Sequence, residues 1–204
     1  MRATAKDGSG TNAAIRVKIV PLATGVQIYQ NGTRVRSNTV FVVDMLTMPT
    51  VKLNAKVFPA KANQSVTLTS SNKKIADFVN GELVCYKPGT VTITAKALDG
   101  SNAKTTFKLT VIKRISSLTL KDGANLTVIG GKTLKLAPMV QISPTDATNK
   151  KLTWSVAPND YGIKISSTGV LSTKKVTSPV TINVMVTTQD GSGLLLSFDV
   201  TVNP

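Results

Sequence analysis

The chain has 204 residues, of which 25 are lysine or arginine and 10 are aspartate or glutamate, for a formal net charge of +15. It contains no histidine and one cysteine, Cys85. Histidine is the usual general base near neutral pH and the commonest metal ligand, and one cysteine forms neither an internal disulfide nor a cysteine-based zinc site. No apolar run reaches the roughly 18 residues of a membrane-spanning helix. We therefore predict no metal, no cofactor and no membrane span in this segment.

The first predicted element is a hairpin within residues 1–23. Apolar residues alternate on both sides of an Asp-Gly pair that begins at Asp7. Asp-Gly between alternating runs is a strong hairpin signal, because both central residues of the turn can adopt positive φ. The same pattern returns at Asp99 and Asp190, after spacings of 92 and 91 residues.

The segments between these turns also align with one another. VKLNAKVFP from Val51 parallels LKLAPMVQISP from Leu134, and NGELV parallels TGVLS. We therefore predict two full repeats, the first over residues 24–113 and the second over residues 114–204. Residues 1–23 would be the C-terminal hairpin of a preceding repeat, and we expect the chain to be cut from a longer array.

Both repeats are predicted to be almost wholly β. Short runs rich in Val, Ile, Thr and Leu alternate with period two and are separated by Gly, Pro, Asn and Ser clusters. Turn signals every 8–12 residues are typical of a β-sandwich. The first repeat carries about seven additional residues near Arg36 to Thr50. Their apolar FVVDML stretch predicts an extra edge strand or a longer hairpin.

This aligned pattern resembles the bacterial immunoglobulin-like domains of group 2. The second repeat carries KTLKL from Lys132, SPTDATNKKLTWS from Ser143, STGVLS from Ser167 and a terminal VTV at Val200. The first repeat carries the matching segments in the same order, with two departures: its insertion, and a leucine where the second repeat has a tryptophan. The resemblance implies an all-β fold of tandem immunoglobulin-like β-sandwiches, preceded by an orphan hairpin.

The resemblance also implies function classes. Such domains occur in intimin- and invasin-like adhesins, in cell-wall and S-layer-associated proteins, beside secreted hydrolases and in phage virions. We expect a non-catalytic extracellular spacer or adhesion module on a bacterial cell surface or cell wall, with adjacent repeats of the same chain as its partners. Two alternatives stay open: a phage capsid or tail decoration that binds host or mucus glycans, and an accessory module of a secreted polysaccharide-degrading enzyme.

The single tryptophan, Trp154, poses a choice between a ligand platform and a core position. Leu152, Trp154 and Val156 alternate on one face of a predicted strand. Leu68 holds the matching place in the first repeat. An apolar residue at this place in both copies predicts that Trp154 and Leu68 are core anchors.

Three lysine pairs in or beside predicted loops are the candidate ligand contacts. The distributed positive charge favours polyanions without specifying one, so the pairs are either solvated faces or weak contacts for an acidic glycan or cell-wall polymer. Nine aromatic residues make a poor stacking platform for nucleic acid, and we predict no specific nucleic-acid partner. The candidate contacts are Lys73, Lys74, Lys150, Lys151, Lys174 and Lys175.

Two other features suggest a calcium site and a reactive thiol, respectively. Each Asp-Gly turn offers one carboxylate, whereas calcium takes six to eight oxygen ligands, so we interpret these segments as turns. Cys85 has no histidine to activate it as a nucleophile, and we expect it to pack as a small apolar side chain.

Overall fold

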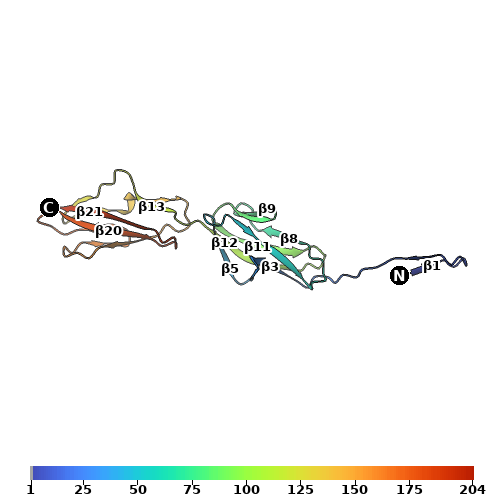
Figure 1. Cartoon of the computed structure of the whole chain (residues 1–204). Helices are drawn as coiled ribbons and strands as arrows, with labels where there is room; N and C mark the ends of the chain where they lie inside the picture. Colours follow the sequence, from blue (N-terminus) through green and yellow to red (C-terminus); the bar gives the residue numbers. More distant parts are fainter. Residues whose placement is uncertain (1) are drawn as a thin grey trace. The chain divides into compact units, whose positions relative to one another are not determined.

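The structure is a computed structural model that describes residues 2–204 (Figure 1). Regular structure in this range is β, apart from one 3-10 turn at Ala137–Met139, so the predicted all-β fold is confirmed. The chain packs into two compact units. Unit 1 comprises Met1–Phe41, Thr50–Cys85 and Thr90–Thr110, and unit 2 comprises Val42–Pro49, Tyr86–Gly89 and Val111–Pro204. The division into repeats at residues 113 and 114 stays a prediction.

The N-terminal hairpin is short. Its strands β1 (Arg2–Thr4) and β2 (Asn12–Ala14) pair antiparallel, and both are exposed. In the turn, the carboxylate of Asp7 accepts a hydrogen bond of 2.9 Å from the backbone N–H of Ser9. Gly8 has a φ of 80°, the backbone conformation that makes glycine favourable in this kind of turn.

The first repeat contains three sheets. The largest has the order β5-β12-β11-β8 and is formed by β5 (Val40–Asp44), β8 (Val66–Ser70), β11 (Gly89–Ala97) and β12 (Lys104–Ile112). The second has the order β4-β3-β7 and is formed by β3 (Gly25–Gln30), β4 (Thr33–Val35) and β7 (Asn54–Phe58). The third has the order β6-β10-β9 and is formed by β6 (Thr50–Lys52), β9 (Ala76–Val79) and β10 (Glu82–Cys85).

The second repeat contains the corresponding three sheets. The largest has the order β14-β21-β20-β17 and is formed by β14 (Thr127–Ile129), β17 (Leu152–Val156), β20 (Val180–Thr188) and β21 (Leu195–Asn203). A two-stranded sheet pairs β13 (Ser117–Leu120) with β16 (Val140–Ser143). The third has the order β15-β19-β18 and is formed by β15 (Thr133–Lys135), β18 (Lys164–Ile165) and β19 (Val170–Ser172).

The two repeats differ by one strand. Each strand of the second repeat has a counterpart at the same place in the matching sheet of the first repeat. Only β4 of the first repeat has no counterpart in the second. The FVVDML stretch does form an edge strand, β5, but β14 holds the same edge in the second repeat. The additional strand is therefore β4, which extends the hairpin begun by β3.

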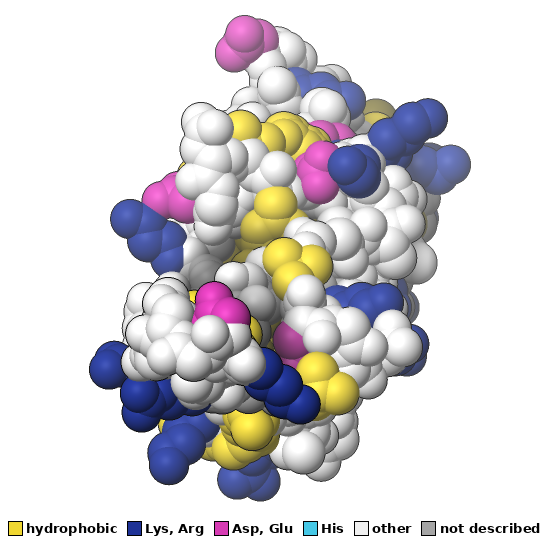
Figure 2. Space-filling model, turned by 90° about the vertical axis from the view of Figure 1, so that its right-hand side faces the viewer, with side chains coloured by type: hydrophobic (Ala, Val, Ile, Leu, Met, Phe, Trp, Pro, Cys, Tyr) yellow, Lys and Arg dark blue, Asp and Glu magenta, His cyan; other side chains and the backbone are white. Residues whose placement is uncertain are grey.

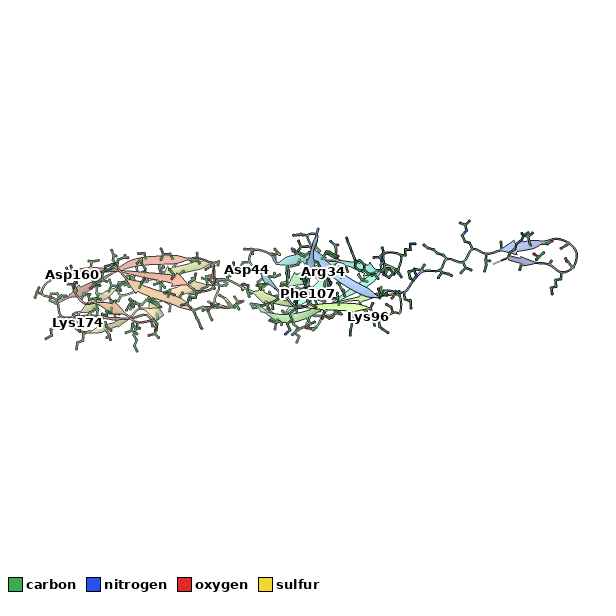
Figure 3. The ribbon with its side chains drawn as sticks, turned by 90° about the horizontal axis from the view of Figure 1, so that it is seen from below. Arg34, Asp44, Lys96, Phe107, Asp160 and Lys174 are labelled. Carbon is green, nitrogen blue, oxygen red and sulfur yellow. The ribbon has the colours of Figure 1, made fainter. Side chains whose placement is uncertain are left out.

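The core of each repeat follows from strand alternation. On β11, Val91, Ile93 and Ala95 are buried, and on β12 Phe107 is buried. Phe107 meets Phe41 edge to face, with ring centroids 6.1 Å apart, and Figure 3 shows it inside the β framework of its unit. The equivalent positions on β20 and β21, which are Ile182, Val184, Val186 and Phe198, are also buried.

Candidate functional site

Trp154 lies on β17 and packs, half-buried, against the apolar core of the second repeat. Its strand register places it opposite Val186. The indole also covers Gly169, where an added Cβ would lie 2.7 Å from Trp154 Cε2. Leu68 is half-buried on β8, opposite Ala95. Trp154 thus packs against the core of the second repeat, and the role of Leu68 as a core anchor of the first repeat stays a prediction.

The six candidate lysines are all exposed and come from separate loops. Lys73 forms an ion pair of 3.6 Å with Asp77, and Lys150 Nζ donates a hydrogen bond of 3.0 Å to the carbonyl of Thr145. Figure 2 shows lysine and arginine side chains projecting at separate points of the surface in view. Lys73 and Lys74 belong to unit 1, whereas the other two pairs lie on two different loops of unit 2.

The Asp-Gly-Ser turns close both repeats in the same way. The Asp99 carboxylate accepts a hydrogen bond from the backbone N–H of Ala23, the residue immediately before the predicted start of the first repeat. The Asp190 carboxylate accepts one from the backbone N–H of Ile115, at the start of the second. Each aspartate is held in place by the serine two residues later, which donates its hydroxyl at 2.6 Å. We call each arrangement the closing hydrogen bond of its repeat.

These hydrogen bonds stabilise the charged form of both carboxylates. The pKa of Asp99 is lowered chiefly by the hydrogen bonds from Ser101, with a further contribution from Ala23. For Asp190, burial is the largest single influence and raises the pKa, but the hydrogen bonds from Ser192, Ile115 and Thr188 together outweigh it and the net shift is downward. Both turns therefore serve an architectural role.

A polar hollow of about 520 Å³ lies beside the β3–β4 hairpin of unit 1. Asn31 and Gly32 form the turn, with φ values of 47° and 79°, as the tight two-residue turn of a hairpin requires. The resulting register sets Arg34 opposite Tyr29. The residues that line the hollow are Gln27, Arg34, Val35, Arg36, Ser37, Asn38 and Thr105.

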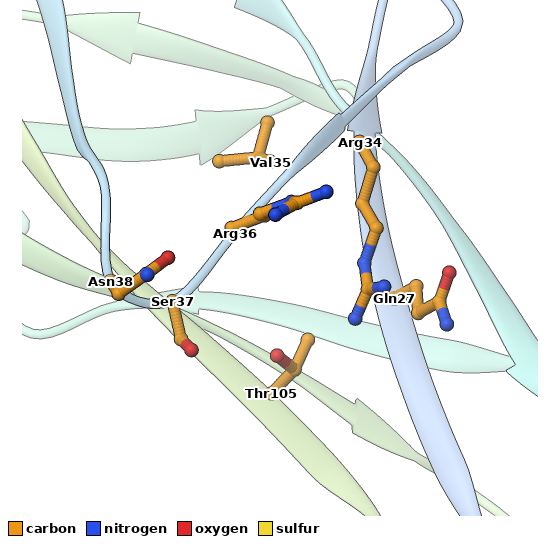
Figure 4. Close-up of a pocket in the computed structure, with 7 residues that line it drawn as sticks. All are labelled: Gln27, Arg34, Val35, Arg36, Ser37, Asn38 and Thr105. Carbon is orange, nitrogen blue, oxygen red and sulfur yellow. The ribbon is translucent and has the colours of Figure 1, made fainter.

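The two arginines of the hollow come from β4 and from the residue that follows it. Arg34 lies on β4, and Arg36 comes immediately after the last residue of that strand. In Figure 4, Arg36 extends toward Arg34, and Gln27 lies beside Arg34. Both arginines are exposed, whereas Ile28 on the opposite side of β3 is 1% exposed. The two guanidinium groups thus converge on the outer face of the sheet.

The hollow is electropositive, and most of the polar side chains that line it have no hydrogen-bond partner within residues 2–204. No residue that lines it is acidic, and within residues 2–204 neither Arg34 nor Arg36 has a side-chain hydrogen bond or ion pair. The oxygen of the Gln27 amide accepts a hydrogen bond of 2.7 Å from Tyr29, so its NH₂ group remains available as a donor. Lys56 Nζ lies 5.1 Å above the ring of Tyr29 and adds positive charge nearby.

Other side-chain chemistry is sparse in the part of the chain that the structure describes. It holds no cluster of three or more His, Cys, Asp or Glu residues suited to a metal ion, and no helix long and apolar enough to cross a membrane. Cys85 lies buried on β10, and this burial raises the pKa of its thiol. A raised pKa disfavours the nucleophilic thiolate.

No family model matches the chain. A curated relative, an uncharacterised protein of Clostridium acetobutylicum, is 29% identical over 160 residues, which covers 78% of this chain and 16% of the relative. The chain therefore spans less than a fifth of that protein's length.

Among solved structures, immunoglobulin domains 1–4 of Sidekick-1 match 99% of this chain and 56% of that chain, with a TM-score of 0.51 and 10% identity. The S-layer protein rSbsC(31-844) covers 96% of this chain and 30% of its own length at a TM-score of 0.36 and 14% identity. Drosophila N-cadherin EC1-4 covers 89% and 49% at a TM-score of 0.37 and 12% identity. The likeness to Sidekick-1 shows the immunoglobulin-like fold, and the predicted sandwich is confirmed.

Proposed function

We propose that the chain is a non-catalytic stretch of tandem immunoglobulin-like domains, of the bacterial group 2 kind, in an extracellular bacterial protein. Its role there is to space or present another part of that protein at the cell surface or cell wall. The observation that carries the proposal is the recurrence of the closing hydrogen bond, Asp99 with Ala23 and Asp190 with Ile115.

The recurrence matters because each closing hydrogen bond joins two residues of the same compact unit, Ala23 with Asp99 in unit 1 and Ile115 with Asp190 in unit 2. It ties the first residues of the repeat to its last hairpin, while the apolar residues of the central strands pack inside that repeat. A domain that closes on itself can be added to or removed from an array without loss of its core. This property suits a spacer, whose length is set by the number of domains.

The proposed surface location rests on two supports. The sequence pattern resembles domains found in bacterial surface proteins, and the Clostridium acetobutylicum relative is a bacterial protein in which the matching stretch is a minor part. A short all-β segment within a much longer bacterial chain is the context expected for a spacer.

Single-molecule pulling on the whole chain tests the mechanical role. Two separate unfolding steps are expected, each releasing roughly 300 Å of chain, because about 90 residues extend by about 3.4 Å each. A single step that releases both repeats together would contradict independent closure. Variant Phe107→Ala should lower the force of one step only, since Phe107 is buried in the first repeat.

Antibody labelling of intact cells that express the full gene tests the location. Labelling of unpermeabilised cells supports the proposal. Labelling that requires permeabilisation, or recovery of the chain in purified virions, contradicts it.

A further inference from the structure

We propose that the arginine-lined hollow beside the β3–β4 hairpin binds the oxyanion groups of an acidic glycan polymer. The shared chemistry is a carboxylate or phosphate carried on a chain of hydroxyl-rich units. Arg34 and Arg36 would hold the anion, and the neighbouring amide and hydroxyl groups would contact the hydroxyls. This function goes beyond the spacer role and does not depend on it.

The first argument is the presence of β4. The second repeat forms the same fold without a counterpart to this strand, so β4 is not needed to close the sandwich. Yet β4 supplies Arg34, and the segment that follows it supplies Arg36, Ser37 and Asn38. Strand β4 and the segment that follows it thus supply five of the seven residues that line the hollow.

The second argument is the hydrogen-bonding capacity that the hollow leaves unused. A guanidinium group presents its N–H donors in a planar fork that matches a carboxylate or phosphate. In residues 2–204 no side-chain partner occupies the forks of Arg34 and Arg36, and none occupies the side chains of Ser37, Asn38 or Thr105. An acidic glycan offers oxyanions to the two guanidinium groups and hydroxyls to the side chains of Ser37, Asn38 and Thr105.

The third argument is the absence of a neutralising neighbour. Within residues 2–204, four cations form ion pairs, among them Lys52 with Glu82 at 3.1 Å and Lys113 with Asp146 at 2.9 Å. Arg34 and Arg36, like most of the cations, are outside these pairs, and no acidic residue lines the hollow. Their charge is therefore available to a ligand.

The lining favours a glycan over a nucleic acid. Single-stranded nucleic acid is usually bound by stacking its bases on exposed aromatic rings. The hollow has no aromatic residue in its lining, and the nearby ring of Tyr29 is half-buried beneath Lys56. Oxyanion and hydroxyl groups need no such ring.

A binding titration with matched variants of the whole chain tests the proposal. The probes are oligogalacturonate for carboxylate, poly(glycerol phosphate) for phosphate, neutral dextran and a single-stranded oligonucleotide. The test variant is R34Q/R36Q. The control variant is K61Q/K96Q, which removes the same charge from exposed positions of the same repeat that do not line the hollow. Thermal melting of both variants verifies that the fold is retained.

The expected result is binding of at least one acidic glycan, weakened by about tenfold or more in R34Q/R36Q, since hydrogen bonds to charged groups are the strong ones. The control should change affinity by less than about threefold at physiological salt, where screening acts over about 8 Å. The glycan that binds identifies the source of the oxyanion. Equal weakening in both variants, binding to neither acidic glycan, or tighter arginine-dependent binding of the oligonucleotide would overturn the proposal.

Discussion

Asp99 accepts a hydrogen bond from the backbone N–H of Ala23, a residue that lies 76 positions earlier in the chain. The pair joins the first buried residue of the chain, immediately before the predicted start of the first repeat, to the turn of that repeat's last hairpin. Asp190 and Ile115 repeat the relationship at a separation of 75 positions. The same short motif therefore makes a turn locally and closes a domain at long range.

Removing the carboxylate should destabilise the repeat that it closes. Variant Asp99→Ala leaves the N–H of Ala23 without its acceptor and frees Ser101, so the melting temperature of the first repeat should fall by a few degrees. The control is Asp7→Ala, because Asp7 sits in the same kind of turn and bonds only the neighbouring Ser9. Differential scanning calorimetry measures both. Equal effects in the two variants would show that the turn alone accounts for the stability.

Stability should depend on acidity through the same aspartates. Their folded-state pKa values lie below the ordinary value of 3.8, so the unfolded chain takes up protons first as the pH falls. The contribution is complete well above pH 3.8 and is lost as the pH falls through the folded-state pKa. Melting temperatures should stay level from pH 7 to pH 5 and then drop. In D99N/D190N the drop should be shallower, and an unchanged slope would contradict the assignment.

The contact between Trp154 and Gly169 predicts a steric effect. Gly169 has a φ of 75° and an added Cβ would overlap the indole, so Gly169→Ala should destabilise the second repeat by about 1–3 kcal/mol through overpacking. The matched control is Gly193→Ala, which has a φ of 73° and open space around its Cβ. The control carries only the backbone cost, roughly 1–2 kcal/mol. Denaturant titration followed by Trp154 fluorescence separates them, since the indole signal should shift only in Gly169→Ala.

Cys85 should react slowly with thiol reagents in the native protein. It is 5% exposed, and burial raises its pKa, so both access and thiolate fraction are reduced. Labelling should become rapid and complete in denaturant. Variant Leu83→Ala should accelerate labelling, because removal of a buried leucine costs about 2–5 kcal/mol and loosens the strand that carries Cys85. Native labelling at the rate of a free thiol would contradict this account.

The sequence predicted the fold through features that act locally. Period-two alternation marked the strands, and Asp-Gly pairs marked the hairpins at Asp7, Asp99 and Asp190. It did not predict the closing hydrogen bonds, because the backbone N–H groups of Ala23 and Ile115 carry no residue-specific signal. Turn chemistry identifies the loop that carries the acceptor carboxylate but not the distant N–H group that donates to it.

The arginine-lined hollow was missed for a different reason. The three lysine pairs stand out in the sequence because their members are adjacent. Adjacent side chains in an extended chain point to opposite sides, so this spacing does not bring two charges to one face. Arg34 and Arg36 alternate, which is the spacing that brings two side chains to one face. Their position just after the Asn31-Gly32 turn signal could have revealed them. The partner residue Thr105 could not be predicted, since it comes from another sheet.

The order of the strands bears on how the chain folds as it is made. The two strands at the centre of each four-stranded sheet, β11 with β12 and β20 with β21, are the last of their repeat to be synthesised. Until that final hairpin emerges, the outer strands of these sheets, β5 with β8 and β14 with β17, have no strand to pair with, and such non-local pairing forms slowly. Each repeat is therefore expected to complete its largest sheet only after its last two strands have left the ribosome.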